Sequence, residues 1–340
     1  MTRHQPAPLL PHLAPLAVPS REELRQLLLN REFSALTERF AQLHTAEAQG
    51  LISERQLERA YDGALNYREE LTVPLREWAA GAPSFYPAQA ALGVHLFGQA
   101  LKLRTMRRAV DIPEENVERM VGAMMAAQAQ LRHAVALDPK ASLALISLMF
   151  IEMQMGNRAW QLYVEAIQKT PNSMLVRLAM LRNLRTEWGG SEQQQLEFLN
   201  RPEHDSLSEE ERHELNARQL TQLAHWQLHF AKDAKAAKRT AQASLALVET
   251  PYALLALADS SAPLRRVKGL SRALELAPHD LHLQASHASA RLESWAPAAP
   301  EFARLREAAD WGEAYATDLL SVELPLWIWR IRAFILLFVR

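Results

Sequence analysis

Four stretches of the sequence repeat one pattern, in which the apolar end of an expected helix is followed by a proline. They read AVALDPKAS, EAIQKTPNS, ALVETPYAL and ALELAPHDL, and their prolines are Pro139, Pro171, Pro251 and Pro278. The first two prolines are 32 residues apart, close to the length of one unit of two helices with their turns. Such a unit cannot bury its apolar face alone, so the pattern predicts a stack of helical pairs.

Residues ahead of the first two prolines also recur at matching offsets. They are Ala127, Leu131 and Ala134, then Ala159, Tyr163 and Ala166. This pattern resembles the tetratricopeptide repeat, where small residues let two helices approach closely and large ones fill the gap. Ahead of Pro278, Leu270 and Ala273 keep part of the pattern, and ahead of Pro251 only Ala246 fits well. The later repeats are therefore expected to be degenerate.

The composition favours helix along the whole chain. Only 11 of the 340 residues are glycine, and no convincing run of alternating β-branched residues occurs. A helix is expected from Glu54 to Leu71, with Pro74 ending or kinking it because proline lacks the N–H that the helix needs. The expected fold class is all-α, a helical-repeat solenoid of tetratricopeptide-like antiparallel helix pairs.

Local signals divide the expected solenoid into segments. Residues 1–19 form a proline-rich tail that we expect to be disordered. Residues 20–110 are expected to form an N-terminal helical region, and residues 111–322 the tetratricopeptide-like repeats. Residues 323–340 form a separate apolar segment. The prolines in the first 19 residues interrupt what would be the apolar core of a signal peptide, so we expect a cytoplasmic protein.

Charge and cysteine content exclude several function classes. The chain has 38 basic and 39 acidic residues, a net charge of −1, which argues against broad binding to nucleic acid. It has no cysteine, which excludes disulfides, thiolate nucleophiles and cysteine-based metal sites.

The stretch EWGGS offers a possible binding site or a simple corner. Trp188 precedes Gly189, Gly190 and Ser191. A phosphate-binding loop would need a lysine after the second glycine and a preceding strand, and both are missing. The favoured interpretation is a helix end with a left-handed glycine, followed by a serine that begins the next helix. If Trp188 is partly exposed, these four residues are the best candidates for contact with a partner.

Catalytic and metal-binding patterns are weak. His225 and His229 have the i, i+4 spacing of a metal pair, but their polar neighbours on the expected helix favour a solvated face. His279, His282 and His287 are expected to lie off the buried stripe formed by Leu281, Ala285, Ala288 and Leu292. We expect no enzyme activity, no metal and no cofactor.

The C-terminal segment LPLWIWRIRAFILLFVR has an unusual composition. Its candidate contact residues are Trp327, Trp329, Arg330, Arg332 and Phe334. Three interpretations remain open: packing back onto the last helices, contact with a partner or second copy, and attachment to a membrane interface. The segment is too short and interrupted for a confident membrane span.

The order of several motifs resembles a bacterial helical-repeat family, domain of unknown function 4034. The matching residues are Leu27, Leu28 and Phe33; Trp78 with Pro83 and Ser84; Leu137, Asp138 and Pro139; and Trp188 to Ser191, followed by Phe198. The resemblance covers about residues 20 to 200. It departs at Thr186 and Glu187, where the family usually has proline and arginine. The family implies no known activity and favours a scaffold.

The expected function is therefore a non-catalytic protein–protein interaction scaffold that binds a partner on its helical-repeat surface. One alternative is a cytoplasmic immunity or adaptor protein for a bacterial toxin. Another is a peripheral membrane protein attached through its C-terminal segment.

Overall fold

The structure is a computed structural model that describes residues 18–64, 69–104, 114–138, 142–156, 158–261, 263–278 and 280–293. Within these ranges every regular element is helical, as the composition predicts. The C-terminal contact residues and nearly all of the N-terminal tail lie outside the described residues. So does the boundary expected near residue 110, and the division into segments stays a prediction.

Fifteen α-helices and three short 3-10 helices make up the described chain. They are α1 (Arg21–Leu29), α2 (Phe33–Ala48), α3 (Glu54–Ala64), η1 (Glu69–Leu71), α4 (Thr72–Gly81), α5 (Tyr86–Arg104), α6 (Glu114–Leu137), α7 (Ser142–Met155), α8 (Ala159–Lys169), α9 (Met174–Asn183), η3 (Thr186–Trp188), α10 (Glu192–Leu199), η4 (Pro202–His204), α11 (Glu209–His229), α12 (Ala234–Leu247), α13 (Pro251–Asp259), α14 (Pro263–Leu276) and α15 (Leu281–Glu293).

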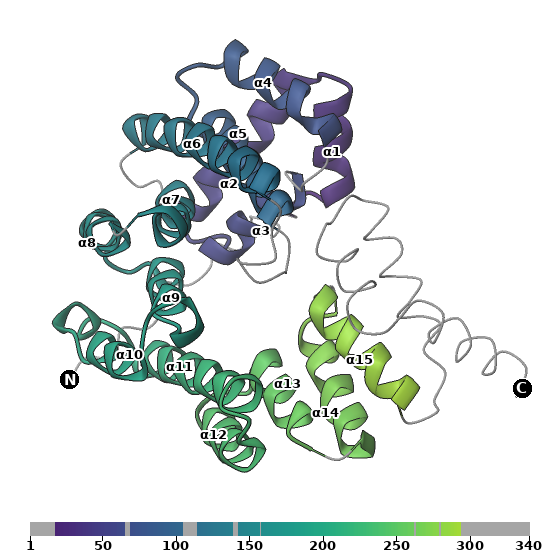
Figure 1. Ribbon diagram of the computed structural model, residues 1–340. Helices are drawn as coiled ribbons and strands as arrows, with labels where there is room; N and C mark the ends of the chain where they lie inside the picture. Colours follow the sequence, from purple (N-terminus) through teal and green to yellow (C-terminus); the bar gives the residue numbers. More distant parts are fainter. Residues whose placement is uncertain are drawn as a thin grey trace, which may run out of the picture.

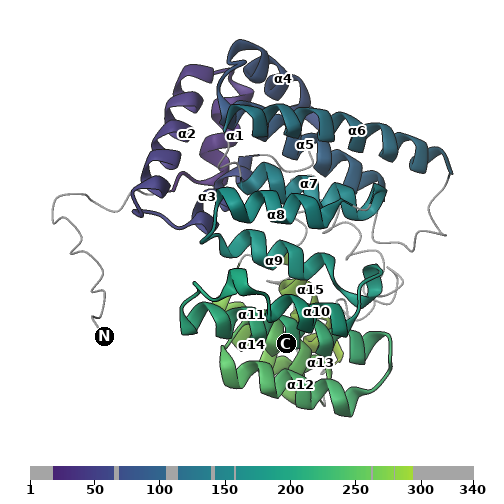
Figure 2. The same cartoon turned by 90° about the vertical axis from the view of Figure 1, so that its left-hand side faces the viewer.

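From α6 onward the helices form a curved array of two rows. Figure 1 shows α7, α9, α11, α13 and α15 on the inner side of the curve, with α8, α10, α12 and α14 on the outer side. Packing follows the same order, since α7 contacts α8 and α9, α11 contacts α9, α12 and α13, and α13 contacts α14. Figure 2 shows the rows stacked from α6 down to α12. This is the expected all-α helical-repeat solenoid.

The N-terminal helices and the first repeats share one apolar core. It extends in sequence from Leu24 in α1 to Leu215 in α11. Its largest buried side chain, Trp78 of α4, donates from Nε1 to Thr37 Oγ1 at 2.9 Å and packs beside Phe40. A second core joins α13, α14 and α15. The first repeats are therefore continuous with the N-terminal helices in their packing.

The recurring residues occupy the interfaces between helices, as predicted, in α6 and α8. Leu131 and Ala134 of α6 are fully buried, as are Tyr163 and Ala166 of α8. The prediction for the third unit is wrong in register, because Ala246 is exposed. The same i, i+4, i+7 pattern is present in α12, two residues earlier, as three buried residues: Ala237, Ala241 and Ser244.

Two prolines act at helix starts, which explains two wrong expectations. Pro251 is the first residue of α13 and does not follow the end of α12 as Pro171 follows α8. Pro74 lies in the first turn of α4, where the missing N–H would have no partner within the helix. Over the expected helix from Glu54 to Leu71, the structure describes α3 and the 3-10 helix η1, and residues 65–68 lie outside the described ranges.

Candidate functional site at the Trp188 corner

The corner between α9 and α10 depends on two glycines that have different roles. Gly189 has φ 91°, the left-handed conformation that closes η3, and its N–H donates to Thr186 O at 3.2 Å. Gly190 approaches the end of α9 so closely that an added Cβ would lie 2.1 Å from Leu184 O. Ser191 then caps α10 by accepting from Gln194 N at 3.1 Å. The predicted helix corner is confirmed, and a role of these residues in binding stays a prediction.

Trp188 at this corner contacts two arginines. The guanidinium carbons of Arg182 and Arg185 lie 5.1 and 4.9 Å from its ring centroid. Each such contact is worth about 0.5–1 kcal/mol at an exposed site. The tryptophan is still 36% exposed, so part of its ring faces solvent. Arg182 also lies over the ring of Phe150 in α7, at 4.9 Å, which links the corner to the preceding inner helix.

A polar network connects the corner to the following inner helix. Arg185 forms an ion pair with Glu187, and its Nη2 lies 3.2 Å from Nδ1 of His225 in α11. His225 Nδ1 is 3.8 Å from Glu187 Oε1, and its ring centroid is 4.5 Å from that of His229. The prediction that His225 lies on a solvated face is therefore only partly correct, because its ring contacts Arg185 and Glu187. Within the described residues, no group of three or more His, Asp or Glu side chains is placed to hold a metal ion.

The residues of α11 that share a face with His225 point to the inner side of the array. Glu214, Arg218, His225 and His229 recur at the spacing of one helix face. Glu214 pairs with Arg55 of α3, a helix that Figure 1 places inside the curve. Arg218 lies over the ring of Tyr252 in α13, 5.4 Å from its centroid. Polar contacts thus connect the Trp188 corner to α11, and the same face of α11 contacts α3 and α13.

A second tryptophan provides a comparison on the outer row. Trp160 of α8 is 40% exposed, and Arg201 lies 4.8 Å from its ring centroid. It packs against Tyr163 and Phe198, whose rings are 5.3 Å apart. Trp160 is therefore similar to Trp188 in exposure and arginine contact, but it belongs to an outer helix and to an aromatic cluster.

His204 lies beneath this aromatic cluster and is held as a neutral imidazole. Its Nε2 is 3.2 Å from Tyr163 Oη, and its Nδ1 is 3.4 Å from Leu199 O. One neutral tautomer satisfies both, since Nδ1–H donates to the carbonyl and Nε2 accepts from the phenol. Burial lowers the pKa of His204 from its ordinary value of 6.5, and burial likewise lowers the pKa of His44.

Acid is therefore expected to destabilise the fold through these histidines. Because their folded-state pKa lies below the unfolded value, the unfolded chain binds more protons as pH falls through about 6.5. Their contribution to stability is complete above that pH and is lost as pH falls toward the folded pKa. Urea unfolding at pH 7.5 and 5.5 measures the difference. His204→Gln should reduce the loss on acidification, and an unchanged loss would contradict this account.

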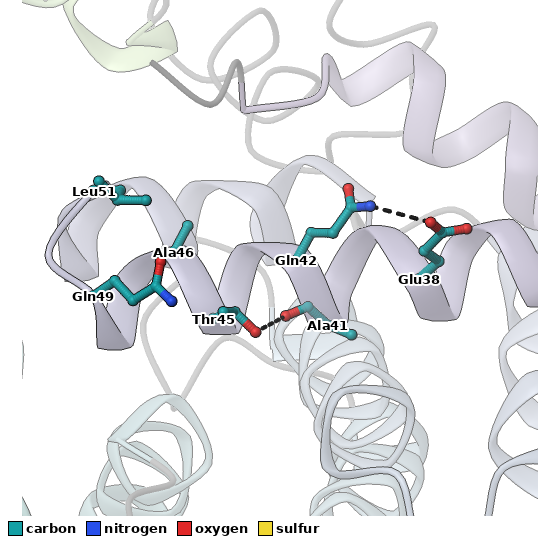
Figure 3. Close-up of a pocket in the computed structure, with 7 residues that line it drawn as sticks. All are labelled: Glu38, Ala41, Gln42, Thr45, Ala46, Gln49 and Leu51. Carbon is teal, nitrogen blue, oxygen red and sulfur yellow. Dashed lines mark hydrogen bonds between the residues drawn. The ribbon is translucent and has the colours of Figure 1, made fainter. Parts of the chain in front are cut away.

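The described surface also has an open groove along α2. Figure 3 shows its lining residues, which are Glu38, Ala41, Gln42, Thr45, Ala46, Gln49 and Leu51. The polar ones bond along their own helix, since Gln42 Nε2 donates to Glu38 Oε1 at 3.2 Å and Thr45 Oγ1 donates to Ala41 O at 2.9 Å. All seven come from α2 and the turn after it, so this groove does not gather groups from different elements around a substrate.

Sequence reasoning identified Trp188 but missed the side chains that hold it. Arg182 and Arg185 precede it by six and three residues, a spacing that could have indicated stacking on the indole. Phe150 and His225 are far away in sequence, and no local signal connects them to the corner. His287 was expected to lie off the buried stripe of its helix, and this is wrong: it is buried and its Nε2 lies 3.0 Å from Ser271 Oγ.

Comparison with known proteins supports part of the expected family resemblance. Residues 20–170 match the family described as Domain of unknown function (DUF4034), so the resemblance is confirmed over that range. The match includes the motifs at Leu27, Phe33 and Trp78, but it ends before the Trp188 corner. No curated protein matches the sequence.

One similar solved chain comes from the crystal structure of the APC/C hetero-tetramer Cut9-Hcn1. It is 17% identical, with 89% of this chain and 69% of that chain covered, at a TM-score of 0.36. At that identity and TM-score, nothing about function follows from the likeness. Separately, none of the helices in the described ranges is long and apolar enough to cross a membrane.

Proposed function

We propose that the chain is a non-catalytic scaffold that binds another protein along the inner face of its helical array, with Trp188 as the anchor. The observation that supports this most is the arrangement of Trp188, whose side chain is exposed yet contacts the guanidinium groups of Arg182 and Arg185. Tryptophan and arginine are the residues most enriched at binding hot spots. A ring fixed before binding loses little conformational freedom when a partner covers it.

The surroundings of Trp188 suit an extended or helical segment of a partner better than a small molecule. The inner face offers side chains from successive helices, including Arg182, Arg218 and His225, spread along the array. Helical-repeat surfaces typically bind elongated segments in this way. Cationic groups flank the ring, so a partner segment with an apolar residue beside carboxylates would fit the chemistry.

Replacing Trp188 with alanine is expected to reduce partner binding by about 30-fold, the effect of losing one hot spot of about 2 kcal/mol. The full chain, Trp188→Ala and Trp160→Ala are each immobilised and exposed to native lysate, and bound proteins are measured by quantitative mass spectrometry. One stoichiometric partner should be retained by the natural chain and by Trp160→Ala, and lost from Trp188→Ala.

Trp160→Ala is the matched control because Trp160 has similar exposure and a similar arginine contact on an outer helix. Circular dichroism of each variant checks that the helices remain. If Trp188→Ala retains the partner as well as the natural chain does, the proposed anchor is wrong. If both variants lose the partner equally, binding depends on the outer row as much as on Trp188, and this contradicts the proposed inner-face site.

A further inference from the structure

Lysine is rare in this chain and is concentrated in one stretch. The sequence has seven lysines, and four of them lie between residues 232 and 268. With its arginines, this stretch has seven basic and three acidic residues, a local charge of +4, whereas the whole chain has a net charge of −1. The near-neutral total therefore conceals a local excess of positive charge.

These basic side chains lie on the outward faces of two outer helices. In α12, Lys235 and Arg239 are exposed, on the side opposite its buried alanines. In α14, Arg265, Lys268 and Arg272 are exposed and have the i, i+3, i+7 spacing of one helix face. Figure 1 places both helices in the outer row of the array.

Two observations connect α12 with α14 in space. Arg272 of α14 donates to both carboxylate oxygens of Glu249, which follows α12, at 3.1 and 2.8 Å. Burial lowers the pKa of His229 at the end of α11, and the charges of Lys232 and Arg266 lower it further. Lys232 precedes α12 and Arg266 lies in the first turn of α14, so both helices begin close to the end of α11.

The acidic residues between positions 233 and 275 already have partners. Arg272 pairs with Glu249 and Glu275, and Arg266 pairs with Asp259. The fourth acidic side chain caps the start of α12. Within the described ranges, six cations of this region form no ion pair, and we call them the basic surface: Lys232, Lys235, Lys238, Arg239, Arg265 and Lys268.

Helix stability does not explain why these cations are placed here. The helix macrodipole favours acidic side chains in a first turn, and the first turn of α11 has three glutamates. The first turns of α12 and α14 have no acidic residue, and Lys235, Arg265 and Arg266 lie there instead. Neighbouring cations also repel one another. Carboxylates from a bound partner would relieve this repulsion.

The neighbourhood of the basic surface limits what can bind to it. The preceding outer helix, α10, and the first turn of α11 are acidic, with Glu192, Glu197, Glu209, Glu210 and Glu211. A long nucleic acid that extended beyond the basic surface would be repelled by these glutamates. Neither α12 nor α14 has an aromatic side chain on which an unpaired base could stack. Their apolar faces are buried in the array, so neither helix can insert one into a membrane.

We propose that the basic surface binds a short acidic segment of a second protein. A helical segment with carboxylates four residues apart would match the spacing of Lys235 and Arg239. Single contacts between exposed charges are weak, so affinity depends on several of them together and decreases as salt increases. The basic surface is on the outer row, so this site is independent of what binds at Trp188.

A fluorescent decaglutamate peptide is the probe, and its anisotropy measures binding to the full chain at low ionic strength. Removing three of the charges, by Lys235→Gln, Arg239→Gln and Lys268→Gln together, should weaken binding about tenfold. All three side chains are exposed, so the fold should be unaffected, and circular dichroism checks this. Added salt should also weaken binding to the natural chain.

The matched control removes three exposed cations elsewhere, by Arg59→Gln, Arg76→Gln and Arg119→Gln together. It changes the net charge of the chain by the same amount and should keep the affinity within about twofold. Equal weakening in the two triple variants would overturn the proposal, because net charge alone would then explain binding. Failure of the natural chain to bind decaglutamate more tightly than decaglutamine would also overturn it.

Two further probes distinguish the class of partner, and a cross-link locates the contact. Tighter binding of a decathymidine oligonucleotide or of phosphatidylserine vesicles than of decaglutamate would contradict a protein partner. A carbodiimide, which joins carboxylates to amines in contact, should link decaglutamate to the lysines of the basic surface in the natural chain. Links at Lys102 and Lys169 in equal yield would contradict the proposed location.

Discussion

Replacing Gly190 with alanine is expected to lower the free energy of unfolding by about 3 kcal/mol. The added Cβ would lie 2.1 Å from Leu184 O and 2.4 Å from its carbonyl carbon. Both are backbone atoms at the end of α9, so no side chain can rotate away to relieve the clash. The corner must open, and with it the packing of α10 on α11. Urea unfolding followed by circular dichroism measures the loss.

Two other glycines serve as controls for this prediction. At Gly189 a Cβ would meet open space but φ is 91°, so Gly189→Ala should cost only about 1 kcal/mol of backbone strain. Gly122 lies within α6 with nothing near its missing Cβ, so Gly122→Ala should stabilise by about 0.5–1 kcal/mol. A Gly190→Ala protein as stable as Gly189→Ala would contradict the close approach of α9 and Gly190.

Replacing Arg177 with methionine is expected to cost about 3 kcal/mol or more. Arg177 is fully buried, and its guanidinium donates to three backbone carbonyls: Ser173 O at 3.0 Å, Pro171 O at 2.7 Å and Glu203 O at 2.7 Å. It joins the start of α9 to η4 across the array. Burial lowers the pKa of Arg177, yet an arginine remains charged at neutral pH. Methionine keeps much of the volume but leaves buried carbonyls without donors.

Arg182→Met tests whether this effect is specific to the buried position. Arg182 lies in the same helix but is exposed, so its loss should change the free energy of unfolding by less than about 1 kcal/mol. Arg177→Lys should lie between the two, because an ammonium cannot reproduce the arginine fork. Equal stability of Arg177→Met and Arg182→Met in urea would show that the three carbonyl contacts contribute little.

The sequence was most informative where structure depends on neighbouring residues. Ser208 followed three residues later by Glu211 is a local signal for a helix start, and the structure has a complete capping box there. The glycine corner after Trp188 was also predictable, because left-handed backbone and a serine cap are local features. The all-α class follows from composition for the same reason.

Features that depend on contacts between distant residues were not predictable in this way. Arg177 sits between Leu175 and Leu178 in α9, and nothing local indicates that it reaches the carbonyl of Glu203. His287 looked like a surface residue because its partner, Ser271, lies in another helix. Pro251 led to the wrong repeat register because a proline can either follow the end of one helix or begin the next. Only the packing of α12 and α13 distinguishes these two positions.

The same limit applies to the candidate site. Trp188 could be selected from sequence because a tryptophan next to a helix corner is an evident anchor candidate. The contacts that fix it come partly from its own neighbourhood, Arg182 and Arg185, and partly from Phe150 through Arg182. The last link depends on how α7 and α9 stack, which a single sequence does not specify.

Hydrogen exchange of the full chain, alone and with its captured partner, tests the central claim most directly. Binding on the inner face predicts that amides slow in η3 and in the inner helices near it, α9 and α11. The outer helices α8, α10 and α12 should keep the exchange rates of the free chain. Slowing confined to the outer helices, or no change around Trp188, would contradict the account.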